Sequence, residues 1–235
     1  MRVIVFLSIM LFSGFVQNTN PEKVKFFIPE SAYGEYDLPK NYQKLEYIGL
    51  FEGKNGFYSQ KTNIKTVNLK NDYDDSFEKQ VKVNSKDECK LLILNKKIAD
   101  HSFKKVTIND NNSILPNFTQ TFDYLGQTYT IYTTGKKTKS LDGDIDFQVG
   151  NYKLFISTVK NGKKITQLIY SVNKFNERMP SEIELAGDID GDGRLDLFMD
   201  ISDSYAGAKY ALFLSSNANY NEIFHLVADY QFSGC

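Results

Sequence analysis

Two stretches of alternating apolar and polar residues, separated by an Asn-Gly pair, constrain the fold of this chain more than any other feature. They cover residues 152–159 and 164–172, and Asn161 and Gly162 lie between them. Alternation with a period of two is typical of a strand that buries one face. Asn-Gly readily adopts the positive φ angles of a tight hairpin turn. The pattern therefore predicts a β-hairpin over residues 152–172.

Similar patterns predict that the rest of the chain is also mainly β. Asn55–Gly56 indicates a second hairpin between residues 45–51 and 57–69. Residues 88–99 fit either a short helix or a buried strand, because their central Leu-Leu-Ile-Leu run has no periodicity. We expect antiparallel sheets in a sandwich-like arrangement, with few or no helices. Further segments rich in β-branched and aromatic residues are 77–83, 103–108, 122–132, 195–201, 210–214 and 224–230.

The charges of the chain nearly cancel, with 28 Lys and Arg against 29 Asp and Glu and a formal net charge of −1. Nucleic-acid binding normally requires a basic patch or stripe, so we expect no nucleic-acid partner. Breaks in the strand pattern near residues 109–117 or 135–143 leave two arrangements open. One is an N-terminal β-rich region over residues 21–120 followed by a C-terminal β-rich region over residues 121–235. The other is a single continuous domain.

The N-terminus has the pattern of a secretory signal peptide. Arg2 is the only charge before an apolar run over residues 3–16, and polar residues follow up to Asn20. That run has about 14 residues, fewer than the roughly 20 that a spanning helix needs. We therefore expect residues 1–20 to be a signal peptide and the mature chain to be exported without an integral membrane span. An uncleaved start that tethers the protein to a membrane is the alternative.

The chain has two cysteines, Cys89 and Cys235. Export would bring them into an oxidising compartment, where two thiols can form a disulfide. Their spacing does not show that the two Cα atoms come within bridging distance. A disulfide between them and two unrelated thiols are both compatible with the sequence.

An acidic stretch over residues 187–200, GDIDGDGRLDLFMD, has the most specific chemical pattern in the chain. Alternate positions of such a loop turn oxygens toward one centre, Gly193 permits a sharp turn, and the Arg194 carbonyl would supply a further ligand. Flexible carboxylates and many protein oxygens favour Ca²⁺ over Mg²⁺ or zinc. The alternative is an Asp- and Gly-rich turn that holds no metal. The predicted carboxylate ligands are Asp188, Asp190, Asp192 and Asp196.

The loop departs from the helix-loop-helix calcium site at its closing position. Met199 stands where that site has a bidentate glutamate, and the residues around it are typical of a strand. We therefore expect a calcium loop joined to β structure. A weaker copy of the pattern occurs at Asp142, Asp144 and Asp146, where Phe147 replaces the glycine. It is a secondary hypothesis for a second site.

Residues 186–197, AGDIDGDGRLDL, resemble the calcium loops of FG-GAP and VCBS-type repeats. The resemblance implies an adhesion or surface-recognition role. It covers about a dozen residues in one clear copy, whereas a β-propeller needs four or more blades, so it extends to the loop and not to the whole fold. The calcium ligands that it implies are Asp188, Asp190, Asp192 and Asp196 together with the backbone of Arg194.

Three functions remain open on the sequence alone, and one of them is a purely structural role in the cell envelope. The favoured one is an exported calcium-binding β protein whose ion stabilises a loop and which recognises a protein or glycan ligand. The alternative is a secreted or periplasmic hydrolase with a structural calcium site. The sequence contains neither a His-Glu-x-x-His motif nor a Gly-x-Ser-x-Gly turn, and its two histidines are His101 and His225. We therefore assign no catalytic residue.

Overall fold

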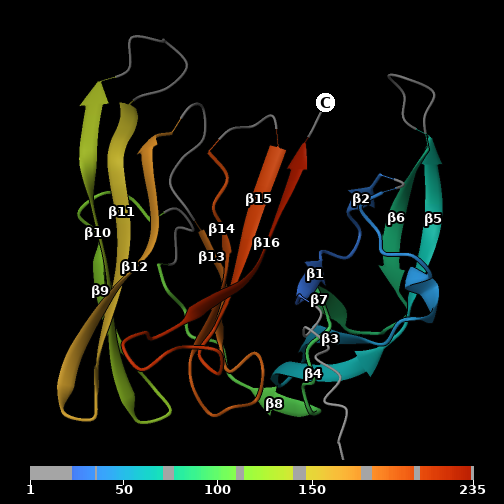
Figure 1. Ribbon diagram of the computed structural model, residues 1–235, viewed down its shortest axis with the longest axis horizontal. Coiled ribbons are helices and arrows are strands. Elements are labelled where there is room, and N and C mark those ends of the chain that lie inside the picture. The colour runs from blue at the N-terminus through green and yellow to red at the C-terminus, as the bar shows by residue number, and fades with distance from the viewer. Residues whose placement is uncertain are drawn as a thin grey trace, which may run out of the picture.

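The computed structural model describes residues 23–34, 36–70, 77–109, 114–139, 147–175, 182–203 and 207–233. These residues form sixteen strands and one short 3-10 helix, η1 (Tyr42–Lys44). The strands make four sheets, and every strand pair is antiparallel. The sheets lie side by side in Figure 1. The expectation of a mainly β, sandwich-like fold is confirmed.

Two of the sheets come from the first part of the chain. The five-stranded sheet has the order β1 (Lys25–Phe27), β7 (Glu88–Leu94), β3 (Tyr47–Gly53), β4 (Gly56–Thr62) and β8 (His101–Phe103). The three-stranded sheet has the order β2 (Ala32–Tyr33), β6 (Phe77–Val83) and β5 (Ile64–Lys70). The expected strand over residues 57–69 is thus two strands, which separate near Asn63 and enter different sheets.

The other two sheets follow in the chain. The outer four-stranded sheet has the order β12 (Lys163–Lys174), β11 (Phe147–Lys160), β10 (Gln127–Lys139) and β9 (Thr119–Tyr124). The central four-stranded sheet has the order β13 (Glu182–Gly187), β14 (Asp196–Asp200), β15 (Gly207–Leu214) and β16 (His225–Ser233). In Figure 1 the central sheet lies between the outer sheet and the five-stranded sheet.

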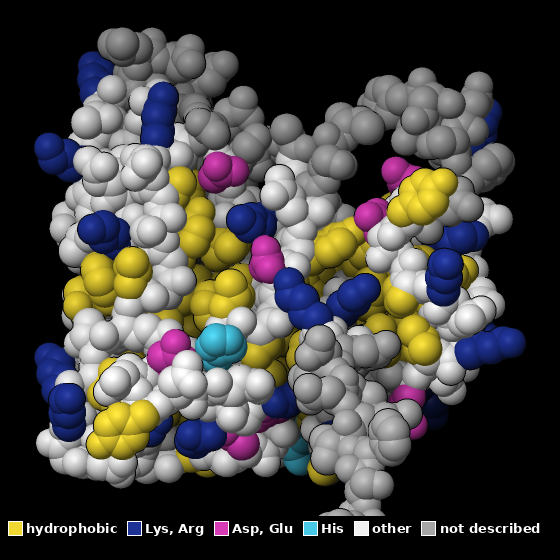
Figure 2. All heavy atoms as spheres, viewed as in Figure 1, with side chains coloured by type: hydrophobic (Ala, Val, Ile, Leu, Met, Phe, Trp, Pro, Cys, Tyr) yellow, Lys and Arg dark blue, Asp and Glu magenta, His cyan; other side chains and the backbone are white. Residues whose placement is uncertain are grey.

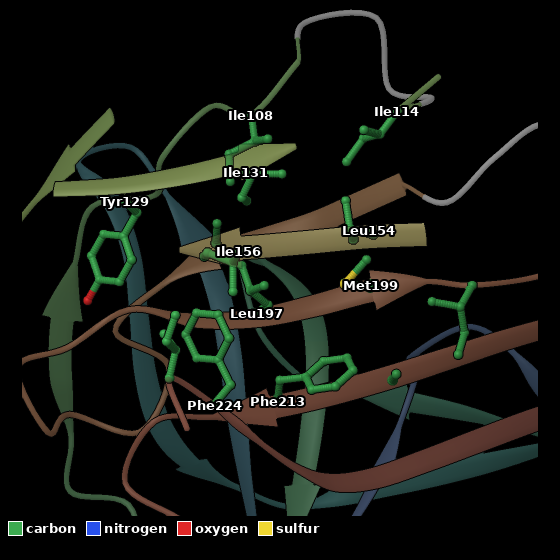
Figure 3. Packing of buried hydrophobic residues seen from close by; sticks show 14 of the residues in the cluster. Ile108, Ile114, Tyr129, Ile131, Leu154, Ile156, Leu197, Met199, Phe213 and Phe224 are labelled. Carbon is green, nitrogen blue, oxygen red and sulfur yellow. The ribbon is translucent and has the colours of Figure 1, made fainter. Parts of the chain in front are cut away.

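The central sheet is buried on both faces. Leu197 and Met199 of β14 pack toward the outer sheet, whereas Phe198 between them packs toward the five-stranded sheet. Figure 3 shows Leu197, Met199 and Phe213 facing Ile131, Leu154 and Ile156 of the outer sheet. Side chains of a strand alternate between the two faces of its sheet. The apolar character of both odd and even positions in β14 follows from this double burial.

The same argument decides between the two interpretations of residues 88–99. Leu91 and Ile93 of β7 pack with the central sheet, and Leu92 and Leu94 pack with the three-stranded sheet. Residues 88–94 therefore form a strand with two buried faces, and the helix alternative is wrong. An unbroken apolar run is what such a strand requires.

The turn at Asn161 and Gly162 has the predicted conformation, with φ values of 53° and 73° between β11 and β12. The hairpin at Asn55–Gly56 also forms, and its turn residues are Lys54 and Asn55. The expected single strand over residues 122–132 is wrong, because a turn at Leu125 and Gly126 divides it into β9 and β10. The expected strand over 103–108 is also wrong, since β8 ends at Phe103.

Several sequence predictions fall on residues outside the described ranges. These are the signal peptide over residues 1–20, the second acidic site at Asp142, Asp144 and Asp146, and the possible disulfide partner Cys235. Cys89 lies in β7 with a free thiol, and burial raises the pKa of that thiol to about 12.

No helix within the described ranges is long and apolar enough to cross a membrane. On the face drawn in Figure 2, lysine and arginine side chains are scattered among acidic ones.

Candidate metal centre

The acidic loop connects two neighbouring strands of the central sheet. It follows β13, which ends at Gly187, and leads into β14, which begins at Asp196. Gly191 and Gly193 have φ values of 78° and 79°, in the left-handed region that glycine adopts without strain. The sharp turn predicted at Gly193 is therefore present. The loop joins strands rather than helices, as expected from its departure from the helix-loop-helix pattern.

The four predicted aspartates come together in this loop. Each offers one carboxylate oxygen, and these four oxygens all lie within 4.8 Å of one another. Oxygens gathered at this spacing could surround one metal ion, since Ca²⁺ binds oxygen ligands at about 2.3–2.6 Å. Met199 lies in the core between the central and outer sheets, and so its side chain takes no part. The members of the cluster are Asp188, Asp190, Asp192 and Asp196.

Asp196 organises the loop from the start of β14. Its side chain is fully buried, and it accepts three main-chain hydrogen bonds. Ile189 N and Asp190 N donate to Oδ2 at 2.8 and 3.2 Å, and Ser215 N donates to Oδ1 at 2.7 Å. A buried carboxylate requires such partners, because desolvation without compensation is costly. Asp196 thereby ties the beginning of the loop to the residue that follows β15.

Two further carboxylates each keep one oxygen without a partner. Asp188 is 8% exposed, and its Oδ2 accepts a hydrogen bond from Gly193 N at 3.0 Å. The Asp190 side chain is 2% exposed. Asp188 Oδ1 and Asp190 Oδ1 are buried and accept no hydrogen bond from any described residue. Buried polar atoms are nearly always satisfied, so this pair calls for a ligand that the protein atoms do not supply.

Two cations neutralise part of the cluster. Lys96 Nζ lies 3.2 Å from Asp190 Oδ2 and is also bound to Ser216 and Asn217. Arg194 donates to Asp192 Oδ2 through Nε at 2.9 Å and Nη2 at 2.6 Å. Four carboxylates against Lys96 and Arg194 leave a formal charge of −2, which one divalent cation would cancel.

The loop is held from the two neighbouring sheets by side chains that the sequence pattern did not indicate. From the outer sheet, the Tyr124 phenol accepts a hydrogen bond from Asp188 N at 2.7 Å, and the Tyr129 phenol is hydrogen-bonded to the Leu195 backbone. From the five-stranded sheet, His101 Nε2 donates to the Asp188 carbonyl at 2.8 Å. The first part of the loop is therefore bonded to both sheets that flank the central one, and its last part is bonded to the outer sheet.

His101 also explains the glycine at position 191. A Cβ atom there would lie 3.1 Å from His101 Nδ1. The ring is fixed from behind, because Nδ1 lies 2.7 Å from Ser59 Oγ and 2.9 Å from the Ala99 carbonyl. Gly191 is thus required both by its positive φ and by the close approach of the imidazole.

The pair of Ser59 and His101 is the nearest approach to a hydrolase nucleophile and base in this site. Ser59 is 2% exposed, and its hydroxyl donates to the Ala99 carbonyl at 2.9 Å. The far nitrogen of His101 meets a main-chain carbonyl, whereas a catalytic triad places a carboxylate there. A nucleophile must reach its substrate. This pair therefore gives no support to the hydrolase alternative, and its observed contacts fix the position of the loop.

The electrostatics of the cluster predict that the stability of the metal-free protein depends on pH. Burial and the charge of Asp190 raise the pKa of Asp196 to about 8, despite the hydrogen bonds from Ser215 and Asp190. Between an unfolded pKa near 4 and this value, the folded chain retains a proton that the unfolded chain releases. Its stability should therefore fall as pH rises through this window and level off above about pH 8. Calcium should reduce this dependence of stability on pH, because a bound cation favours the ionised carboxylate.

Thermal unfolding in chelator between about pH 5.5 and 8.5 checks this expectation. The melting temperature should decrease with pH in the metal-free protein, and the slope should be smaller with calcium present. The Asp196→Asn variant is the control, because an amide does not titrate. A metal-free melting temperature that rises with pH over the same range would show that Asp196 is ionised without the ion.

No protein-family model, curated protein or solved structure matches this chain. Its class is therefore defined by its own fold and site. It is a mainly β protein whose central sheet carries a cluster of four aspartates that could hold a metal ion.

Proposed function

We propose that this chain is an exported calcium-binding protein in which the ion fastens the loop between β13 and β14. The observation behind the proposal is the pair of buried carboxylate oxygens, Asp188 Oδ1 and Asp190 Oδ1, that accept no hydrogen bond from the described residues. Leaving such atoms unsatisfied costs about 1–3 kcal/mol each, and more when the group is charged. Coordination of a cation would recover that cost.

Calcium is the ion that best fits the chemistry of the cluster. All four side chains offer carboxylate oxygens, which suit hard cations. The residual charge of −2 matches a divalent ion. Calcium accepts six to eight oxygen ligands in flexible geometry, whereas magnesium demands a near-ideal octahedron and keeps several waters. In this proposal the Arg194 carbonyl adds a ligand to the four carboxylates.

The bound ion would neutralise the carboxylates of the cluster. It would also stabilise the contacts between the loop and the two flanking sheets. Asp188 is bonded through its main chain to Tyr124 of the outer sheet and to His101 of the five-stranded sheet. Fixing the Asp188 carboxylate therefore fixes a residue that both flanking layers contact. Binding in such a site is coupled to local folding, because the assembled ligand set does not exist in the unfolded chain.

Export and recognition complete the proposal. Export rests on the apolar start of the chain, and recognition of a protein or glycan rests on the resemblance of the loop to FG-GAP and VCBS-type repeats. An oxidising extracellular setting also offers millimolar calcium, which a site of modest affinity needs. The loop would then serve as a calcium-dependent support for a recognition surface.

Thermal unfolding of the mature chain tests the metal assignment. We expect chelation to lower the melting temperature, calcium to restore it, and magnesium at the same concentration to restore much less of it. The reason is that only ligands bound by the folded state stabilise it, in proportion to the logarithm of their excess over Kd. Equal melting temperatures in chelator and in millimolar calcium would contradict the proposal. Edman sequencing of the protein recovered from the medium or periplasm tests export separately.

A further inference from the structure

A hollow of about 260 Å³ lies directly beside the acidic loop. Its walls come from four places: the turn between β9 and β10, the end of β11, the connection between β15 and β16, and the loop itself at Gly193 and Arg194. Pockets for drug-sized ligands measure about 300–1,000 Å³, so this hollow suits a smaller molecule, such as a single sugar ring. The polar side chains on its walls include Gln127, Thr158, Lys160, Arg194, Ser215 and Glu222.

The charges on these walls favour an anion. Arg194 and Lys160 contribute two cations, and the Arg194 side chain is 47% exposed. Among the residues that the structure describes, Lys160 Nζ has one hydrogen-bond partner, the Glu222 carbonyl at 3.4 Å. Glu222 adds one carboxylate to these walls, and that carboxylate is bonded to Asn219 N at 3.0 Å and to His225, neither of which lines the hollow. A carboxylate is the group that arginine and lysine recognise together.

The same residues contact the metal cluster. Gly193 N donates to Asp188 Oδ2, and Arg194 donates to Asp192 Oδ2 through two nitrogens. Ser215, also on the wall, donates its hydroxyl to Asp192. A divalent cation coordinated by the Asp192 carboxylate would weaken the ion pair between Asp192 and Arg194, because it neutralises part of the carboxylate charge. The guanidinium is then available to a second anion, and the hollow is the open space next to it.

We propose that this hollow binds a small carboxylate-bearing ligand of about the size of one sugar ring, and that a bound divalent ion strengthens this binding. The second part rests on the calcium site proposed above. Arg194 is the coupling residue, because it is shared between Asp192 and the hollow. Linkage makes the effect reciprocal, so the ligand strengthens calcium binding by the same factor.

Calorimetric titration of the full chain with methyl glucuronide, an acidic single-ring probe, tests the proposal, and methyl glucoside is the neutral control. We expect the glucuronide to bind the calcium-loaded protein at least about fivefold more tightly than the chelated protein, which is the lower end of ordinary coupling. The glucoside should not bind measurably. Absence of glucuronide binding to the calcium-loaded protein, or equal binding of the two sugars, overturns the proposal.

Substitutions separate the hollow from the metal cluster. Lys160→Gln removes a wall cation that contacts none of the four aspartates, and it should weaken glucuronide binding while leaving the calcium-induced melting shift unchanged. Lys153→Gln, an exposed change on the same strand, is the matched control and should alter neither quantity. Retention of full glucuronide affinity by Lys160→Gln refutes the site. Glucuronide binding that is identical with calcium and with chelator refutes the coupling alone, and the absence of any calcium-induced melting shift refutes the calcium function.

Discussion

Replacing Asp190 and Asp192 together by asparagine should abolish the stabilisation of the protein by calcium. At a hundredfold excess over Kd, a ligand adds about 2.7 kcal/mol to the free energy of unfolding. For a chain of this size that corresponds to a rise in melting temperature of about 5–10 °C. The double variant should show no such rise, because the two amides remove two formal charges and two anionic ligands from the cluster. The measurement is thermal unfolding in calcium and in chelator.

A second double variant controls for the loss of charge alone. Asp203 and Asp229 are exposed and lie outside the cluster, so Asp203→Asn with Asp229→Asn makes the same change in net charge. This control should keep the calcium response of the parent protein. In chelator, the cluster variant should be no less stable than the parent, since it relieves repulsion between buried acids. A full calcium response in the cluster variant would show that the ion, if bound, lies elsewhere.

Asp196→Ala should lower the free energy of unfolding by about 3–5 kcal/mol, whether or not calcium is present. The substitution leaves the N–H groups of Ile189, Asp190 and Ser215 without their acceptor in a buried place. Each unsatisfied buried donor costs about 1–3 kcal/mol. The substitution should therefore destabilise the metal-free protein as well as remove a metal ligand. Urea unfolding in chelator measures the first loss of stability, and urea unfolding in calcium measures the sum of the two.

Asp192→Ala is the contrasting variant. The Asp192 side chain is the most exposed of the cluster, at 17%, and its partners are Arg194, which is 47% exposed, and the hydroxyl of Ser215, which is buried. In chelator its substitution should cost about 1–3 kcal/mol, less than Asp196→Ala, because one buried hydroxyl rather than three buried N–H groups loses its acceptor. If Asp196→Ala and Asp192→Ala unfolded at the same urea concentration in chelator, the organising role of Asp196 would be wrong.

The strand content was predictable because most strands bury at least one face in a regular pattern. The hairpin at Asn161 formed as expected, since both turn residues adopt positive φ readily. The turn at Leu125 was missed for the opposite reason. Leucine rarely adopts a φ of 48°, and an apolar residue in an aromatic stretch is typical of a strand. The pairing of β9 with β10 overrides that local preference.

The cluster was predictable because its four carboxylates lie within nine residues of sequence, so local spacing alone brings them together. The side chains that hold the loop are distant in sequence. Tyr124 and His101 precede Asp188 by 64 and 87 residues, and they reach it only because two other sheets flank the central one. Lys96 likewise reaches Asp190 from the segment after β7. No pattern within the loop encodes these contacts.

The position of the central sheet has a consequence for the order in which the protein can assemble. Its strands lie in residues 182–233, which follow both flanking sheets in the chain. During synthesis, the five-stranded and outer sheets therefore emerge before the layer that covers one apolar face of each. Neither of these two cores can close until the ribosome has released the central strands. This delay exposes apolar surface, which favours aggregation of incomplete chains and makes early chaperone binding advantageous.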